Sequence, residues 1–199
     1  MHHGNRHGRS EEARQAVLEA ADDLMVEKGF AGLTVEGIAN RAGVAKQTIY
    51  RWWPSKTEIL IEAFVDDAAD YLTPPDTGDL ATDLRRHLAK VADFLTQTDA
   101  GAVFRALAGQ AQHDPAVAER LRADHLTHQR ERDSQPLLRA IARGDHPADT
   151  DVDFAVEQLV SPIYYRVLVT GEPVPRKYTN RLVTQYLSLG GPGRAEGLR

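Results

Sequence analysis

The chain has 199 residues, 42% of them hydrophobic, which is enough for a sizeable core in one large domain or two small ones. It has no cysteine, so disulfide bonds and thiolate metal sites are excluded, and no run of about 18 apolar residues suits a membrane span. The net charge of −5 argues against binding nucleic acid over the whole surface, yet residues 1–56 carry a slight excess of Lys and Arg. We expect a cytoplasmic protein with no membrane partner and a locally basic N-terminal quarter.

Both ends of the chain are polar or rich in glycine. Residues 1–9 start basic but lack the apolar stretch of a secretory signal, and residues 191–199 read GPGRAEGLR. Such segments bury too little apolar surface to offset the entropy lost on ordering. We therefore predict a disordered arm at the start of the chain and a disordered tail at its end.

The first predicted helix begins with Ser10 as its N-cap, because two carboxylates follow it in the first turn. Apolar residues then recur at helical spacing over residues 13–24. Gly29 follows the last of them at a short distance and is typical of a residue that ends a helix.

Three shorter helices are predicted next. Thr34 caps the helix VEGIANRA, Gly43 forms a tight turn, and a third helix runs to about Trp53. A capping box over residues 55–58 then opens a fourth helix that extends to about Leu72.

Helical patterns also dominate the rest of the chain. Asp114 and Pro115 open a long helix to about Arg143, and Pro162 should kink or loosen a long apolar helix. No alternation of apolar and polar residues is long enough to predict a β-strand, so we predict an all-α fold of about nine helices. The predicted helices beyond residue 72 cover about residues 80–97, 100–112, 115–143, 151–171 and 176–189.

The segment from Thr34 to Trp53 matches the plan of a helix-turn-helix motif, although a generic helical hairpin with surface charges is the plain alternative. Side chains at the start of the second helix reach base edges in such motifs, and Lys, Gln and Thr can all read bases. Other donors nearby suit phosphates. The candidate base readers are Lys46, Gln47 and Thr48, and the candidate phosphate contacts are Thr34, Tyr50, Arg51 and Lys56.

The run LTVEGIANRAGV, the Ile49-Tyr50 pair, an aromatic at Trp53, and Ser55-Lys56 followed by Leu60 resemble the N-terminal domain of the tetracycline-repressor (TetR) family of transcription regulators. The resemblance covers about residues 10–60. It implies that Tyr50 and Lys56 contact phosphates and that the residues from Lys46 to Thr48 read bases. Trp52 stands where the family often has a His, and we include it among the candidate DNA contacts.

The stretches HDPAVAERL and LVSPIYYRVLVTGEPV resemble the ligand-binding domains of the same family more loosely. The resemblance implies an all-helical body over 57–190 behind a DNA-binding domain over 10–56, a homodimer built mainly from the last two helices, and a small-molecule pocket. An apolar pocket with a few polar groups suits such a ligand, although ordinary core packing is the alternative for each residue. The candidates are Phe64, Phe94, Phe104, Leu107, His125, Gln158 and Tyr164.

The helix over residues 151–171 has an apolar stripe that serves either as internal core or as a dimer seam. We favour the seam, mostly because of the resemblance. The stripe consists of Val152, Val156, Leu159, Val160, Ile163 and Val167, and its expected partners on the last helix are Leu182, Val183, Tyr186 and Leu187.

Enzyme signatures are missing from the sequence: it has no phosphate-binding glycine loop, no nucleophile elbow and no zinc-protease motif. His125 and His128 have a spacing that permits metal ligation, but this spacing is also common by chance on a solvent-facing helix. We predict no enzyme activity, no cofactor and no metal.

Together these patterns favour a ligand-responsive regulator that binds a palindromic operator in double-stranded DNA as a homodimer. We expect it to be a repressor that an unidentified small-molecule effector releases from DNA. The alternative is a helical protein that binds or sequesters a small molecule without sequence-specific DNA binding.

Overall fold

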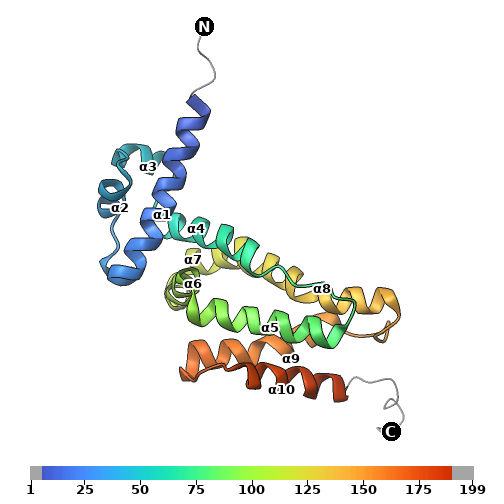
Figure 1. Ribbon diagram of the computed structural model, residues 1–199. Helices are drawn as coiled ribbons and strands as arrows, with labels where there is room; N and C mark the ends of the chain where they lie inside the picture. The colour runs from blue at the N-terminus through green and yellow to red at the C-terminus, as the bar shows by residue number, and fades with distance from the viewer. Residues whose placement is uncertain (1–5, 190–199) are drawn as a thin grey trace. The chain divides into compact units, whose positions relative to one another are not determined.

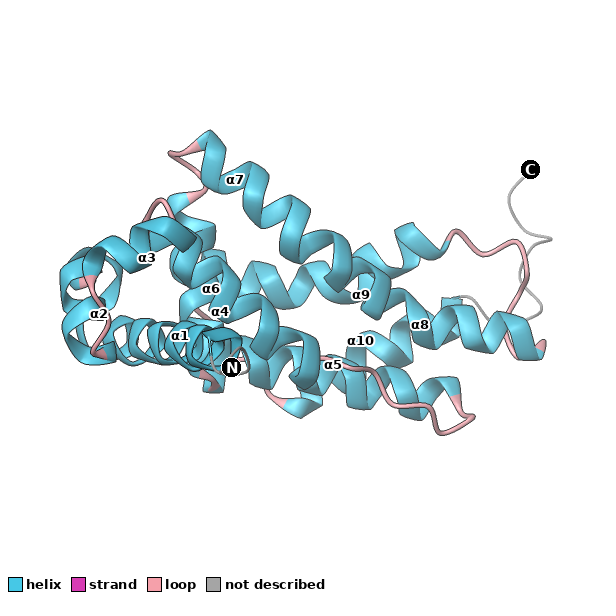
Figure 2. Ribbon diagram, turned by 90° about the horizontal axis from the view of Figure 1, so that it is seen from above, coloured by secondary structure: helices cyan, strands magenta, loops and turns pink. Residues whose placement is uncertain are grey.

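A computed structural model describes residues 6–189, apart from the side chains of residues 6–9, 66, 67, 70 and 189. Within that range the chain forms helices joined by short loops and no strand, which confirms the all-α prediction (Figures 1 and 2). The predicted tail and the first five residues of the predicted arm lie outside the described residues.

The chain folds as two compact units that interleave along the sequence. The first unit contains the residues up to Ala68 together with Thr98–Asp124, and the second contains Ala69–Gln97 together with the residues from His125 onward. The sequence, in contrast, predicted a single domain boundary, directly after Lys56. The helices of the first unit are α1 (Arg6–Gly32), α2 (Val35–Ala42), α3 (Lys46–Trp52), most of α4 (Lys56–Tyr71), α6 (Asp99–Gln110) and α7 (Pro115–Leu121).

Helix α1 differs from its prediction at one end and agrees with it at the other. It begins at Arg6, four residues before the expected cap, so Ser10 lies inside the helix rather than at its start. Gly29 has a φ of 66° and interrupts the helix where the sequence predicted its end. Only glycine adopts that backbone angle without strain. The buried face of α1 includes Val17, Leu18, Ala20, Ala21, Leu24 and Met25.

Helices α6 and α7 belong to the first unit and each begins with a side-chain cap. Thr98 accepts a hydrogen bond from the Gly101 N–H, and Asp114 accepts bonds from two N–H groups after Pro115, as the sequence predicted for Asp114. Helix α6 packs on α1. It also meets α4, where the ring centroids of Phe104 and Phe64 lie 5.4 Å apart.

Two predicted long helices each contain a π-helical turn. The helix predicted to run from residue 115 to 143 is divided into α7, the π segment η1 (Arg122–Leu126) and α8 (Thr127–Arg143). Helix α9 (Val152–Tyr165) passes through Pro162 and gives way to the π segment η2 (Arg166–Thr170). Such turns hold an extra residue, which shifts the buried stripe around the helix. The sequence predicted a kink or a loosened turn at Pro162, and the π segment begins shortly after this proline, at Arg166.

The second unit is built from α5 (Leu80–Gln97), α8, α9 and α10 (Arg176–Leu189), and α10 has the bounds that the sequence predicted. Helix α5 packs against α8, α9 and α10, and α9 and α10 lie side by side (Figure 1). Their shared core is apolar and includes Leu84, Leu88, Val91, Leu95, Leu137, Leu159, Ile163 and Val183.

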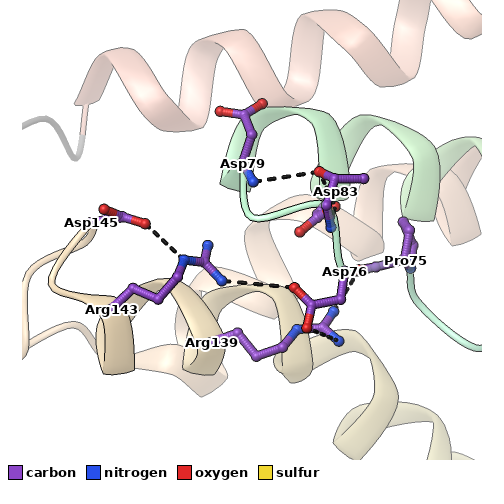
Figure 3. Close-up of polar contacts among 8 residues, drawn as sticks. Pro75, Asp76, Asp79, Asp83, Arg139, Arg143 and Asp145 are labelled. Atoms are coloured by element: carbon purple, nitrogen blue, oxygen red, sulfur yellow. Dashed lines mark hydrogen bonds and ion pairs between the residues drawn. The ribbon is translucent and has the colours of Figure 1, made fainter.

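Two arginines of α8 hold the loop between α4 and α5 (Figure 3). Arg139 donates a hydrogen bond to the Pro75 carbonyl at 2.6 Å. The Asp76 carboxylate lies 3.7 Å from Arg139 and 3.8 Å from Arg143, and Arg143 also bonds Asp145 at 2.8 Å. The chain that leaves α4 is therefore fixed to the C-terminal half of α8.

Candidate DNA-binding surface and effector-binding body

The turn between α2 and α3 has the geometry of a helix-turn-helix motif. Thr34 has extended backbone angles, and its Oγ1 accepts a hydrogen bond from the Gly37 N–H at 3.0 Å, which caps α2. Gly43 ends α2 with a φ of 65°, and its N–H donates to the Ala39 carbonyl. A side chain at Gly43 would meet no atom within 4 Å, so backbone conformation alone requires glycine there.

Helix α3 has one buried residue and an outward polar face. Ile49 is fully buried and anchors the helix, while Thr48 is half-buried. Successive residues of an α-helix point about 100° apart, so the neighbours of Ile49 point elsewhere. The exposed side chains of α3 are those of Lys46, Gln47, Tyr50 and Arg51.

The ammonium group of Lys56 is engaged within the protein. Its Nζ donates hydrogen bonds to the carbonyls of Phe30, at 2.7 Å, and Leu33, at 2.9 Å, and lies 4.4 Å from the centroid of the Phe30 ring. An ammonium has three donors, so one remains for a phosphate. Thr34 uses its hydroxyl as an acceptor in the cap and keeps its O–H as a donor.

The two tryptophans at the end of α3 have different environments. Trp52 is half-buried, with its ring 5.4 Å from the Trp53 ring and 5.7 Å from the Arg51 guanidinium. Trp53 is only 3% exposed, and its Nε1 donates to Oε2 of Glu62 in α4 at 2.9 Å. The sequence does not predict this bond, because no local pattern around Glu62 indicates its partner.

Known protein families match both the N-terminal and the C-terminal part of the chain. The family model for bacterial regulatory proteins of the tetR family matches residues 17–63, and the model for a tetracyclin repressor-like C-terminal domain matches residues 74–186. The HTH-type transcriptional regulator YdeS of Bacillus subtilis is 37% identical over 175 residues, which cover 88% of each chain. The chain belongs to the TetR family of transcriptional regulators.

Other relatives agree with this assignment to the TetR family. The DNA-binding transcriptional repressor TetR of Mycobacteroides abscessus is 29% identical over 90% of this chain and 94% of its own. The crystal structure of the TetR-family regulator SCO0332 is 35% identical, with a TM-score of 0.78 over 89% of this chain and 97% of its own. The fold, the family and the function of a DNA-binding transcriptional regulator are therefore confirmed. No membrane-spanning helix is found in the described part of this TetR-family chain.

The candidate effector-binding residues of this TetR-family chain fall in different places. Phe64, Phe104 and Leu107 are buried in the first unit. Phe94 and His125 are buried in the second unit, which also contains the partly buried Tyr164. Gln158 also belongs to the second unit but lies on the exposed side of α9. The seven candidates are therefore divided between the two units, three in the first and four in the second.

A buried polar cluster joins α5 to α8, and its residues were not among the site residues predicted from the sequence. His87 is 1% exposed and its Nε2 lies 2.6 Å from Oδ1 of Asp133. Gln129 donates to the same oxygen at 2.6 Å, and Arg132 donates to Oε1 of Gln129 at 3.1 Å. The signal that could have found the cluster is the position of His87 on the apolar face of α5, beside Leu84 and Leu88.

Burial alters the ionisation of the groups near this cluster. Burial lowers the pKa of His125 to about 3, and the charges of Arg132 and His128 act in the same direction. Burial also raises the pKa of Tyr164 above its ordinary range, with a further contribution from the Asp133 carboxylate. His125 is thus neutral at pH 7, and Tyr164 keeps its proton.

The predicted dimer seam on α9 is in part wrong. Its stripe packs inside the chain, because α9 lies against α5, α8 and α10. The residues of the predicted seam that are buried in this way are Val156, Leu159, Val160, Ile163 and Val183. Other apolar side chains remain exposed on α9 and η2, namely Phe154, Tyr165, Leu168 and Val169.

Two surface grooves lie beside α9, and Phe154 lines one of them. One, of about 300 Å³, lies between α9 and α10 and is lined by Gln158, Pro162, Leu182, Gln185 and Tyr186. The other, of about 340 Å³, shares Gln158 and Tyr186 with it and extends to Phe154 and His146. The His146 ring bonds the Tyr186 hydroxyl at 3.0 Å, which fixes the wall between the two grooves.

The two histidines considered as metal ligands have different surroundings. His125 is 2% exposed, whereas the His128 side chain is 59% exposed and lies 3.3 Å from Glu131. Among the described residues, no group of three or more metal-ligating side chains comes together.

Proposed function

We propose that this TetR-family regulator is a repressor that binds an inverted-repeat operator as a homodimer and leaves it when a small molecule binds its helical body. The observation that carries the proposal is the outward polar face of α3, fixed by the single buried residue Ile49. A helix anchored on one side presents the other to a major groove. The name of the Mycobacteroides abscessus relative favours repression.

The residue types on α3 divide the proposed contacts into two kinds. Gln47 suits bidentate pairing with adenine, Lys46 suits guanine, and Thr48 offers a hydroxyl and a methyl group. Tyr50 and Arg51, one turn further on, are donors that suit phosphates. We assign phosphate contact also to Thr34 and to the third donor of Lys56, and contact with the sugar-phosphate backbone to Trp52.

The effector is proposed to bind in the helical body, next to the aromatic and polar side chains predicted from the sequence. Support comes from the burial of Phe94 and His125 in the second unit, which also contains the partly buried Tyr164. The buried cluster around His87 and Asp133 offers additional polar groups.

Helix α4 is the proposed link between effector and operator, because it starts directly after Ser55, next to the end of α3, and continues into the second unit. A ligand that prefers one conformation of the body would change DNA affinity by the difference in its binding energy, typically about 1–3 kcal/mol. Since chromosomal DNA is the proposed target, we place this activity in the cytoplasm.

Selection of random and genomic DNA fragments by the purified protein at near-physiological salt tests the proposal. Enrichment of one inverted repeat is the expected result, with half-sites about one helical turn or a multiple apart. Salt-sensitive binding without any enriched sequence would contradict sequence-specific regulation, because phosphate contact alone behaves in this way. Absence of DNA binding by ligand-free protein would instead favour a protein that sequesters a small molecule.

A further inference from the structure

Glu62 of α4 connects three parts of the first unit. Its Oε2 accepts the hydrogen bond from Trp53 Nε1 at 2.9 Å, and its Oε1 forms an ion pair with Arg14 of α1. The Glu62 side chain is 32% exposed, so these bonds are partly shielded from water. A carboxylate that accepts a hydrogen bond from an N–H forms a stronger bond than a neutral acceptor would.

Trp53 is the residue at which the recognition helix α3 ends. Its own N–H donates to the Ile49 carbonyl at 2.8 Å, and its ring is buried. A buried ring held at both its backbone and its indole nitrogen has few rotamers left. The position of Trp53 therefore fixes the last turn of α3, which carries Tyr50 and Arg51.

Packing alone would not require a hydrogen bond from residue 53, since a phenylalanine there would fill much of the same space as Trp53. The indole N–H makes a difference because it ties the ring to one carboxylate on α4. Rotation of α4 by one residue turns a side chain by about 100°, and would carry Glu62 out of reach of Trp53. The orientation of α3 thus depends on the orientation of α4.

We propose that Glu62 is a positioning residue for DNA recognition: through Trp53 it sets the orientation of α3 according to the orientation of α4. The inference rests on the proposed function, because it assumes that α3 reads the operator. It assigns Glu62 no contact with DNA.

Helix α4 provides a matched control one turn earlier. Glu58 is also a partly exposed carboxylate, and it pairs with Arg120 of α7 at 3.0 Å rather than with any residue of α3. Glu58→Gln and Glu62→Gln each remove one negative charge from the same helix. A general effect of charge on DNA affinity would therefore appear in both variants.

The test compares four full-length variants with wild type: Glu62→Gln, Trp53→Phe, the double variant and Glu58→Gln. Affinity for the selected operator should fall about tenfold for Glu62→Gln and for Trp53→Phe, since either change removes the charge-assisted bond. The double variant should lose no more than either single variant, because both act on one interaction. The slope of affinity against salt should stay unchanged, since no phosphate contact is lost.

Amide hydrogen exchange on the DNA-free protein provides a second readout. Exchange over residues 46–53 should accelerate in Glu62→Gln but not in Glu58→Gln, while exchange in the core of α1 stays as in wild type. Equal operator affinity in Glu62→Gln and wild type, or equal losses in Glu62→Gln and Glu58→Gln, would overturn the inference and leave the proposed function intact. If wild-type protein enriches no DNA sequence, the proposed function and this inference both fail.

Discussion

Neighbouring side chains on the outward face of α3 are expected to differ in what they read. Gln47 and Tyr50 are both exposed, but an amide can pair with a base edge and a phenol suits a phosphate. Gln47→Ala should cost about 1–3 kcal/mol of discrimination at one base pair, whereas Tyr50→Phe should weaken binding to all sequences alike. Titration of the operator and its single-base variants measures both. A uniform loss with Gln47→Ala would contradict its role in reading a base.

Lys56 combines a structural role with its predicted contact to DNA. Lys56→Ala removes the donor to the carbonyls of Phe30 and Leu33, and should lower the free energy of unfolding by about 1–2 kcal/mol. It should also lower the salt slope of DNA binding by about one unit through the remaining donor.

Lys46→Ala is the control for the stability effect of Lys56→Ala. Lys46 is exposed, and its ion pair with Glu36 is long, at 3.9 Å, so its loss should change the free energy of unfolding by less than about 0.5 kcal/mol. Urea unfolding of both variants makes the comparison. Equal stability of the two variants would show that the bonds from Lys56 to the carbonyls of Phe30 and Leu33 contribute nothing.

At the scale of single elements, the π segment η1 places a histidine where it cannot ionise without cost. The folded-state pKa of His125 is about 3 and its ordinary value is 6.5, so the unfolded chain binds its proton first. The contribution of neutral His125 to the free energy of unfolding is fully present above pH 6.5. It declines as the pH falls toward 3, by about 1.4 kcal/mol per pH unit.

The change that tests this linkage is His125→Gln, which should flatten the fall in stability between pH 7 and pH 5. Urea unfolding at several pH values measures the slope. His128→Gln serves as the control, because it removes a histidine three residues away whose side chain is 59% exposed rather than buried. Equal slopes for the two variants would mean that His125 is accessible to protons in the folded protein.

Helix ends were the features most readily predicted from the sequence, because caps act within a few residues. Thr34, Gly43 and Asp114 cap the expected helices, and the last helix has the expected bounds. The prediction at Ser10 was wrong, since a good capping residue also tolerates the interior of a helix that starts earlier. The π turns were not predicted either, because both segments keep an apolar spacing close to that of an α-helix.

Tertiary partners explain most of the remaining differences at the candidate sites. His87 and Asp133 are 46 residues apart in sequence, and neither segment has a local pattern that predicts its contact with the other. The apolar stripe on α9 was compatible with two interpretations, an internal core and a dimer seam. The packing of α5, α8 and α10 against α9 shows that most of the stripe belongs to the internal core. The outward face of α3 could be predicted because one buried residue, Ile49, sets the phase of the whole short helix.

At the scale of the whole molecule, an inverted-repeat operator requires two recognition helices held together. The four exposed apolar side chains on α9 and η2 form our candidate for the dimer interface, because exposed apolar patches commonly mark contacts between proteins. Phe154 is 57% exposed and lines the larger groove. Large aromatic side chains in such positions commonly dominate interface energetics.

Phe154→Glu should therefore raise the dissociation constant of the dimer by about thirtyfold, equivalent to about 2 kcal/mol. A monomer carries one α3, so affinity for the complete inverted repeat should fall toward that for a single half-site. Leu138→Glu is the matched control, because Leu138 is 45% exposed but belongs to α8. Sedimentation velocity over a range of concentrations measures the dimer directly. A Phe154→Glu protein that dimerises as tightly as Leu138→Glu would mean that the two subunits meet on another face.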